Sequence, residues 1–235
     1  MANFQTHITT SSILGVLYGV GGHVFLDLTI PHCMVAGALC SVAGMLPDLD
    51  SDSGIPQREM LCFISVLIPM LMLRRLEALG LDNEMMVFTA GMIYVFTRFG
   101  IGWVFKKFTK HRGMWHSIPA AMIAGLVTFL VVLSPELEVR VFKAWAVVIG
   151  FVSHLILDEI YAVDWEGKTI RIKRSFGTAM KWFGSSPYIN ISTYAKLGVL
   201  IFLALSDTSL MEYLGREPLE FSLTADELFQ RPPVR

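Results

Sequence analysis

The chain holds three short clusters of residues that could bind a metal ion. The first lies in Leu-Pro-Asp-Leu-Asp-Ser-Asp, where Asp48, Asp50 and Asp52 alternate with other residues. In an extended or turning segment alternate side chains point to one side, and carboxylates suit hard and borderline divalent cations. The alternative is a hydrophilic turn in which Asp48 or Ser51 caps the next helix. The glycine and glutamate of an EF-hand loop are missing at the required offsets, which excludes that motif.

The second cluster lies in Lys-His-Arg-Gly-Met-Trp-His-Ser, just before an apolar block. His111 and His116 are five residues apart, and Gly113 between them allows a turn that brings both imidazoles together. Imidazole is the commonest metal ligand of proteins. Arg112 adds a fixed cationic fork suited to a phosphate or carboxylate. The alternative is a belt of histidine, tryptophan and arginine at the membrane interface.

The third cluster is a histidine–aspartate pair in an apolar stretch. His154 and Asp158 are four residues apart, so they share one face of a helix. Ionisable groups at membrane depth cost several kcal/mol unless they are partnered, which makes them functional candidates. The alternative is a hydrogen-bonded pair that joins two helices, and the same aspartate could orient a metal-bound histidine.

The composition indicates that these clusters belong to a membrane protein. The 235 residues are 54% hydrophobic and only 17% charged, against about 25% charged in an ordinary soluble domain. The net charge of -1 gives no electrostatic indication of nucleic-acid binding, so we expect no nucleic-acid partner. Three cysteines, none in a Cys-x-x-Cys spacing, do not suggest a disulfide framework.

Long apolar blocks separated by short polar loops predict an all-α bundle of six or seven transmembrane helices. The blocks fall at about 11–27, 32–46, 60–76, 84–105, 117–134, 141–161 and 194–206. Glycines in the first block allow close helix approach. We therefore expect one transmembrane domain over residues 1–206, followed by a polar, partly disordered tail over 207–235.

Residues 162–193 interrupt the apolar pattern with a basic segment. It alternates polar and apolar residues around Gly167, which predicts a short strand or hairpin. Its five basic residues suit a surface beside anionic head groups, and a solvated cytoplasmic loop is an equal alternative.

The charges of the loops predict an orientation. With the N-terminus inside, the loops at 47–59, 106–116 and 162–193 are cytoplasmic and carry ten basic residues, against four outside. The polar clusters then share the cytoplasmic face, and His7, ahead of the first helix, joins them. His23 and His32 fall at the other end and are left out.

With these residues in place, the sequence resembles the YdjM-like family of inner-membrane metal-dependent hydrolases. The resemblance rests on His7 before a glycine-rich helix, Leu-Pro-Asp-Leu-Asp from Leu46, His-Arg-Gly-x-x-His-Ser from His111 and Ser-His-x-x-x-Asp from Ser153. It covers most of the first 160 residues. The chain departs from the family pattern at Trp115, where we expect threonine.

The resemblance implies a hydrolase of the bacterial inner membrane that uses a divalent metal. We expect Zn²⁺ or Mn²⁺, held by residues drawn from all the clusters: His7, Asp48, Asp50, His111, His116, His154 and Asp158. Such an ion lowers the pKa of a bound water toward about 7. Asp52 could then act as general base and Arg112 could hold a phosphoryl oxygen. The expected partners are the lipid bilayer and a small-molecule or lipid-derived substrate.

Two other functions fit the same residues. A divalent-cation transporter would use the buried histidines and aspartates as a transit site, but polar residues would then be expected at several depths. A non-catalytic scaffold would use the metal to join its helices, with the basic segment recruiting a partner.

Overall fold

The chain forms a bundle of helices with one small hairpin. The computed structural model describes residues 3–50, 54–101, 103, 114–166, 169–172 and 177–216, without the side chains of residues 49, 50, 54–60, 101, 164–166 and 169–172. The helices of the described residues are α1 (Phe4–Leu26), α2 (Ile30–Ala43), the 3-10 helix η1 (Leu46–Asp50), α3 (Gly54–Ala78), α4 (Asn83–Val95), the π-helix η2 (Phe96–Ile101), α6 (Ile118–Val131), α7 (Leu137–Ile160), α8 (Pro187–Leu205) and α9 (Thr208–Tyr213). The hairpin pairs β1 (Val163–Glu166) antiparallel with β2 (Thr169–Ile172).

Four of the described helices are long and apolar enough to cross a membrane: Phe4–Leu26, Ile30–Asp48, Leu137–Ile160 and Pro187–Leu205. This number is lower than the six or seven predicted. The fourth apolar block is not one long helix, because α4 ends at Val95 and the backbone widens into η2. The apolar α6 has 14 residues, or about 21 Å at 1.5 Å per residue, which is short of a full bilayer core.

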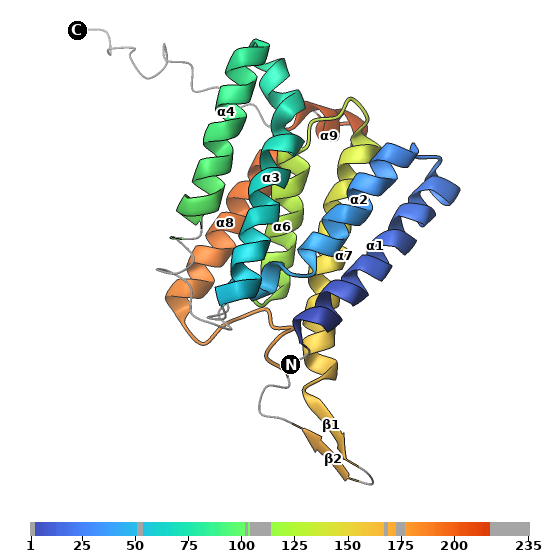
Figure 1. The fold of residues 1–235 in the computed structure, drawn as a ribbon, viewed down its shortest axis with the longest axis vertical. Helices are drawn as coiled ribbons and strands as arrows, with labels where there is room; N and C mark the ends of the chain where they lie inside the picture. Colours follow the sequence, from blue (N-terminus) through green and yellow to red (C-terminus); the bar gives the residue numbers. More distant parts are fainter. Residues whose placement is uncertain are drawn as a thin grey trace, which may run out of the picture.

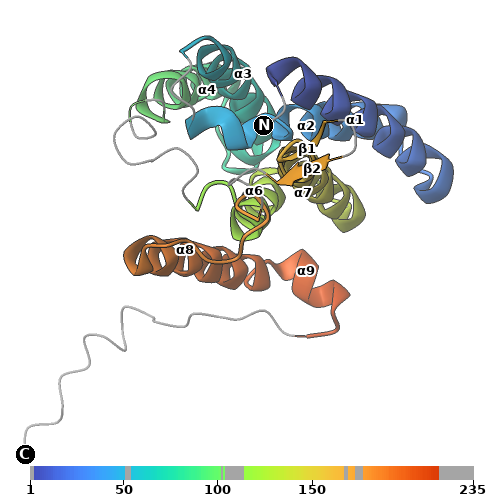
Figure 2. The ribbon, with the colours of Figure 1, turned by 90° about the horizontal axis from the view of Figure 1, so that it is seen from below.

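Helix α7 lies at the centre of the bundle. It packs against α1 and α2 on one side and α6 on another (Figure 1). Seen along the bundle, α4, α3, α2 and α1 form one row, α6 and α7 a second, and α8 with α9 a third (Figure 2). Apolar residues of α2 and α7 make the main core, and Phe151 and Leu155 continue it toward α6. Helix α7 therefore contributes side chains to both of these core clusters.

Two close backbone contacts require glycine. A β-carbon on Gly37 would lie 2.8 Å from the carbonyl oxygen of Gly15, so α1 and α2 touch there through their backbones. A β-carbon on Gly150 would overlap the carbonyl oxygen of Cys40, which brings α7 against α2. Small residues permit such close packing between membrane helices.

The first helix begins earlier than the sequence indicated. The Oδ1 of Asn3 accepts a hydrogen bond from the Thr6 N–H at 2.8 Å and caps α1. His7 therefore lies inside α1, not ahead of it, and is 2% exposed.

The predicted tail begins with residues that pack on the bundle. Asp207 caps α9 and forms an ion pair with Arg140, and Met211 is buried. Residues 217–235 lie outside the described residues.

Candidate metal centre

Five polar side chains converge at the end of the bundle where the N-terminus and the hairpin lie (Figure 1). They come from four separate elements: His7 from α1, Asp48 from η1, His116 from the segment before α6, and His154 with Asp158 from α7. The three imidazoles and the Asp158 carboxylate are almost completely buried, with exposed fractions of 1–3%. A polar cluster of this burial needs internal partners, because water cannot solvate it.

The hydrogen bond of His154 determines which of its nitrogens faces the cluster. Its Nδ1–H donates to the carbonyl oxygen of Gly44 at 2.7 Å, and a carbonyl can only accept, so Nδ1 carries a proton. Its Nε2 lies 3.6 Å from Oδ1 of Asp48 and 3.9 Å from Oδ2 of Asp158. In the neutral ring that nitrogen presents a lone pair beside two carboxylates, a set of ligand atoms that could hold a cation.

His7 stacks on His154 and also approaches Asp158. The ring centroids are 3.7 Å apart and the planes differ by 12°. The Nε2 of His7 lies 3.5 Å from Oδ1 of Asp158. The packing of α1 on α7 therefore places two imidazoles and one carboxylate around the same point.

The donor atoms fall into two groups of the size that a metal ion needs. In the first, ligand atoms of His7, His154 and Asp158 lie within 4.8 Å of one another, and in the second those of Asp48, His116 and His154 do. His154 belongs to both. Because its Nδ1 is engaged with Gly44, one nitrogen remains to bind an ion. The groups are thus either alternatives or parts of one five-ligand centre.

The residues present fit a divalent cation. Nε2 of His154 and both oxygens of Asp158 are buried and make no hydrogen bond to any described residue. Buried polar atoms are usually satisfied, so each of these requires a partner. The mixture of imidazole and carboxylate ligands suits Zn²⁺, Mn²⁺ and related ions.

Neighbouring residues hold the elements that carry the cluster. The Trp115 indole N–H donates to the carbonyl oxygen of Leu46 at 2.7 Å, which joins the segment before α6 to η1. Ser117, next to His116, caps α6 through its side chain. Trp115 therefore connects two of the segments that supply site residues.

Glu159 organises the chain beyond the hairpin. Its carboxylate accepts backbone hydrogen bonds from Gly177 and Ala179, both at 2.7 Å, and from Met180 at 3.3 Å. The Ile118 N–H donates to the carbonyl oxygen of Lys181 at 3.2 Å, which ties the same loop to the start of α6. Sequence analysis did not single out Glu159, although it directly follows Asp158. Gly44 binds His154 through its backbone carbonyl. Because every residue has such a carbonyl, the sequence could not indicate this contact.

The structure describes only part of the expected site. His7, Asp48, His116, His154 and Asp158 meet in one cluster. Asp50 ends η1, but its side chain lies outside the described residues, as do Asp52, His111 and Arg112 entirely. Segment Leu46–Asp50 is a 3-10 helix, which is the turning and not the extended form of the predicted segment, and it directs Asp48 into the cluster.

Comparison with known proteins identifies the family. No curated protein and no solved structure matches the chain. The family model described as YdjM inner membrane protein matches residues 1–204, which include every residue of the cluster. Together with the long apolar helices, this match establishes an integral membrane protein, and the chain belongs to the YdjM family of inner membrane proteins.

Proposed function

We propose that this protein is a metal-dependent hydrolase that acts at the cytoplasmic surface of the membrane. The observation that carries the proposal is the position of Nε2 of His154. This nitrogen is buried, carries no hydrogen bond to a described residue, and lies within 4 Å of two carboxylates from different elements. A divalent cation compensates for this concentration of lone pairs and negative charge.

His7, Asp48, His116, His154 and Asp158 would hold the ion, with Asp50 and His111 as the further ligands expected from the sequence. When bound, the ion would polarise the scissile group and make water a nucleophile at neutral pH. Gly44 fixes the tautomer and the orientation of His154 through its carbonyl. Asp52 would accept a proton from the attacking water, and Arg112 would hold an anionic oxygen of the substrate.

The location of the cluster suits a substrate that lies at the membrane surface. It sits at one end of the bundle, next to the hairpin and the loop that Glu159 holds. The described parts of segment 162–193, the hairpin strands and residues 177–186, lie at this end (Figure 1). The positive-inside rule favours the cytoplasm for the segment because of its basic sequence. A phosphoester or a lipid-derived substrate fits a basic membrane surface. In the proposed topology of six or seven crossings with the N-terminus inside, the cluster faces the cytoplasm.

The interior face of α7 argues against a cation transporter. Beyond His154 this face presents the buried apolar residues Phe151 and Val147. Lys143 and Arg140 follow, with Lys143 about 16 Å from His154 at 1.5 Å per residue. A cation leaving the cluster along α7 would therefore meet an apolar layer and then two positive charges, which oppose its passage.

Metal content tests the binding part of the proposal. Detergent-purified wild type, Asp158→Asn and His154→Ala are compared by plasma mass spectrometry. His32→Ala is the matched control, because His32 lies in the first turn of α2, whose opposite end leads into η1 and Asp48. We expect near-stoichiometric zinc or manganese in the wild type and the control, and loss in both cluster variants. Equal metal in all four proteins would refute the site.

Hydrolysis of a generic phosphoester tests the chemical part. Activity in wild type that disappears in Asp158→Asn, with His32→Ala unaffected, is expected. Stoichiometric metal with no hydrolysis of phosphoesters or lipids would favour the structural scaffold. Metal uptake into proteoliposomes without hydrolysis would favour the transporter.

A further inference from the structure

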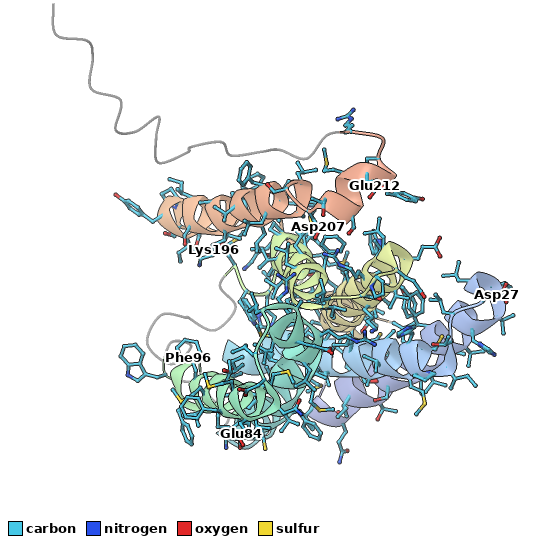
Figure 3. The ribbon with its side chains drawn as sticks, turned by 90° about the horizontal axis from the view of Figure 1, so that it is seen from above. Asp27, Glu84, Phe96, Lys196, Asp207 and Glu212 are labelled. Carbon is cyan, nitrogen blue, oxygen red and sulfur yellow. The ribbon has the colours of Figure 1, made fainter. Side chains whose placement is uncertain are left out.

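Four basic side chains gather at the end of the bundle opposite the metal centre. Arg74 and Arg75 lie in the last turns of α3, and Arg140 and Lys143 lie in the first two turns of α7. These are the four basic residues that the proposed topology places outside, on the side with fewer positive charges. Figure 3 shows this end from above, with Asp207 beside the ends of α6 and α7.

Two of the four charges have structural partners. The Arg140 guanidinium binds both carboxylate oxygens of Asp207 at 3.0 and 2.6 Å and stacks over the Phe129 ring at 4.3 Å. Arg140 also donates to the carbonyl oxygen of Phe129 at 3.3 Å, and Arg75 donates to that of Leu130 at 2.5 Å. These carbonyls belong to the last turn of α6, where helical partners are missing, so both arginines act as C-terminal caps.

Lys143 has no such partner. It is 8% exposed, although its position in the second turn of α7 is inside a candidate membrane span. No described carboxylate forms an ion pair with it, and the described acids nearest along the chain, Glu136 and Glu138, are exposed. Arg74 adjoins Arg75, which binds the Leu130 carbonyl next to the Phe129 carbonyl that Arg140 binds, so the end of α3 brings a further positive charge to this end of α7. Two like charges without an anion in a region of low dielectric are unfavourable.

We propose that Lys143 and Arg74 bind a phosphate group at this end of the bundle, in a site separate from the metal centre. Arg75 and Arg140 contribute further positive charge, which Asp207 only partly offsets. The Lys143 ammonium, at the tip of a side chain whose residue is 8% exposed, and the exposed Arg74 guanidinium would approach the phosphate from two helices. Charge-assisted hydrogen bonds to phosphate are the strong ones. The phosphate belongs either to the head group of an anionic phospholipid or to a soluble ion.

The depth of the two side chains suits either source. Arg74 is four residues before the end of α3 and Lys143 six residues after the start of α7, so both lie within about two helical turns of this end of the bundle. Long basic side chains can extend from such positions to a head-group region. In the alternative, Lys143 only extends its ammonium toward water, as lysines near helix ends do. This alternative predicts no response to phosphate.

Thermal unfolding of delipidated full-length protein in a neutral detergent separates these possibilities. Melting temperatures are measured with phosphatidylglycerol in mixed micelles and, separately, with inorganic phosphate at constant ionic strength. The proteins compared are wild type, Lys143→Met, Arg74→Gln and the control Lys196→Met. Lys196 is an exposed lysine of α8 (Figure 3).

We expect wild type and Lys196→Met to be stabilised by the same additions. Lys143→Met and Arg74→Gln should need about tenfold more ligand for the same rise, the loss of one charge-assisted hydrogen bond. Without ligand, Lys143→Met should melt higher than wild type, because it removes a positive charge that has no carboxylate partner among the described residues and keeps the apolar length of the side chain.

Each outcome is decisive. A response to inorganic phosphate supports the site and identifies a soluble ion, whereas a response to phosphatidylglycerol alone supports it and identifies a lipid head group. No response to either, or an equal response in all four proteins, overturns the proposal. If Lys143→Met does not fold, Arg74→Gln decides alone, because Arg74 is exposed and its loss leaves the core intact.

Discussion

His7 and His154 stack face to face, with ring centroids 3.7 Å apart and planes inclined by 12°. Two imidazolium ions at this separation would repel each other strongly in a buried site. The contact therefore favours at least one neutral ring, which is the form that binds a metal ion. The stacking also depends on α1 lying against α7, so the site and the packing of these helices are linked.

Metal removal should lower the stability of the wild type. A ligand that binds only the folded state stabilises it by about 2.7 kcal/mol when it is present at 100 times its dissociation constant. We expect the melting temperature of the wild type to fall when a chelator is added and to recover with zinc or manganese. Asp158→Asn should respond to neither. The same response in both proteins would show that any bound metal lies elsewhere.

Gly150→Ala should destabilise the bundle. The new β-carbon would overlap the backbone carbonyl of Cys40, which cannot move without shifting α2 away from α7. Overpacking of this kind costs about 1–3 kcal/mol or more, measured as a loss in thermal or denaturant stability in detergent. Gly91→Ala is the control, because nothing lies within 4 Å of its β-carbon position. Gly91→Ala should be neutral or stabilising, and an equal loss in both variants would contradict the close contact.

Asp207→Asn should destabilise the protein at neutral pH. It leaves the Arg140 guanidinium, 1% exposed, without its anion. Because Asp207 is itself partly exposed, we expect a loss of about 1–3 kcal/mol in the free energy of unfolding, less than for a fully buried pair. The check is the melting temperature of the variant against that of wild type at pH 7, and identical values would show that the pair contributes nothing.

The contribution of Asp207 should disappear in acid. Burial raises the pKa of its carboxyl, but the hydrogen bond and charge of Arg140 outweigh burial and hold the pKa below the ordinary value of 3.8. The pair therefore stabilises the fold fully above that ordinary value and loses its effect as the pH falls through the lower, folded-state value. The difference in melting temperature between wild type and Asp207→Asn should shrink below about pH 4. A difference that stays constant to pH 2 would contradict this.

Glu159→Ala should loosen the loop that follows the hairpin. Three backbone N–H groups of residues 177–180 lose their acceptor. Because two of these bonds are exposed and water can replace the acceptor, the loss is the net value of a hydrogen bond, about 0.5–1.5 kcal/mol each at most. We expect faster amide hydrogen exchange in residues 177–181, measured by mass spectrometry. Glu136→Ala, an exposed glutamate at the start of α7 that makes no capping hydrogen bond, should leave this exchange unchanged. Unaltered exchange in Glu159→Ala would mean that other contacts hold the loop.

Local patterns in the sequence predicted the class of the fold and part of the site. Apolar blocks separated by charged loops are sufficient to predict a helical membrane protein, because a bilayer requires each span to satisfy its own backbone hydrogen bonds. His154 and Asp158 could be paired from sequence, since a separation of four residues places both on one helix face. The predicted orientation placed His7 on the same face as the clusters, and the resemblance to the YdjM family, which the family match over residues 1–204 confirms, also included it.

Only the tertiary structure decided which of these residues meet. His7 and Asp158 are separated by most of the chain, and the contact of α1 with α7 depends on how several helices pack, which no local pattern encodes. The start of α1 depends on the side-chain cap at Asn3. The hydrogen bond from His154 to Gly44 uses a backbone carbonyl, which every residue possesses, so the residue type at position 44 could not predict it. The sequence by itself thus determined which chemistry is available, because residue types and helical spacing are local. Packing decided where that chemistry is assembled, because the distances between ligand atoms depend on contacts between distant parts of the chain.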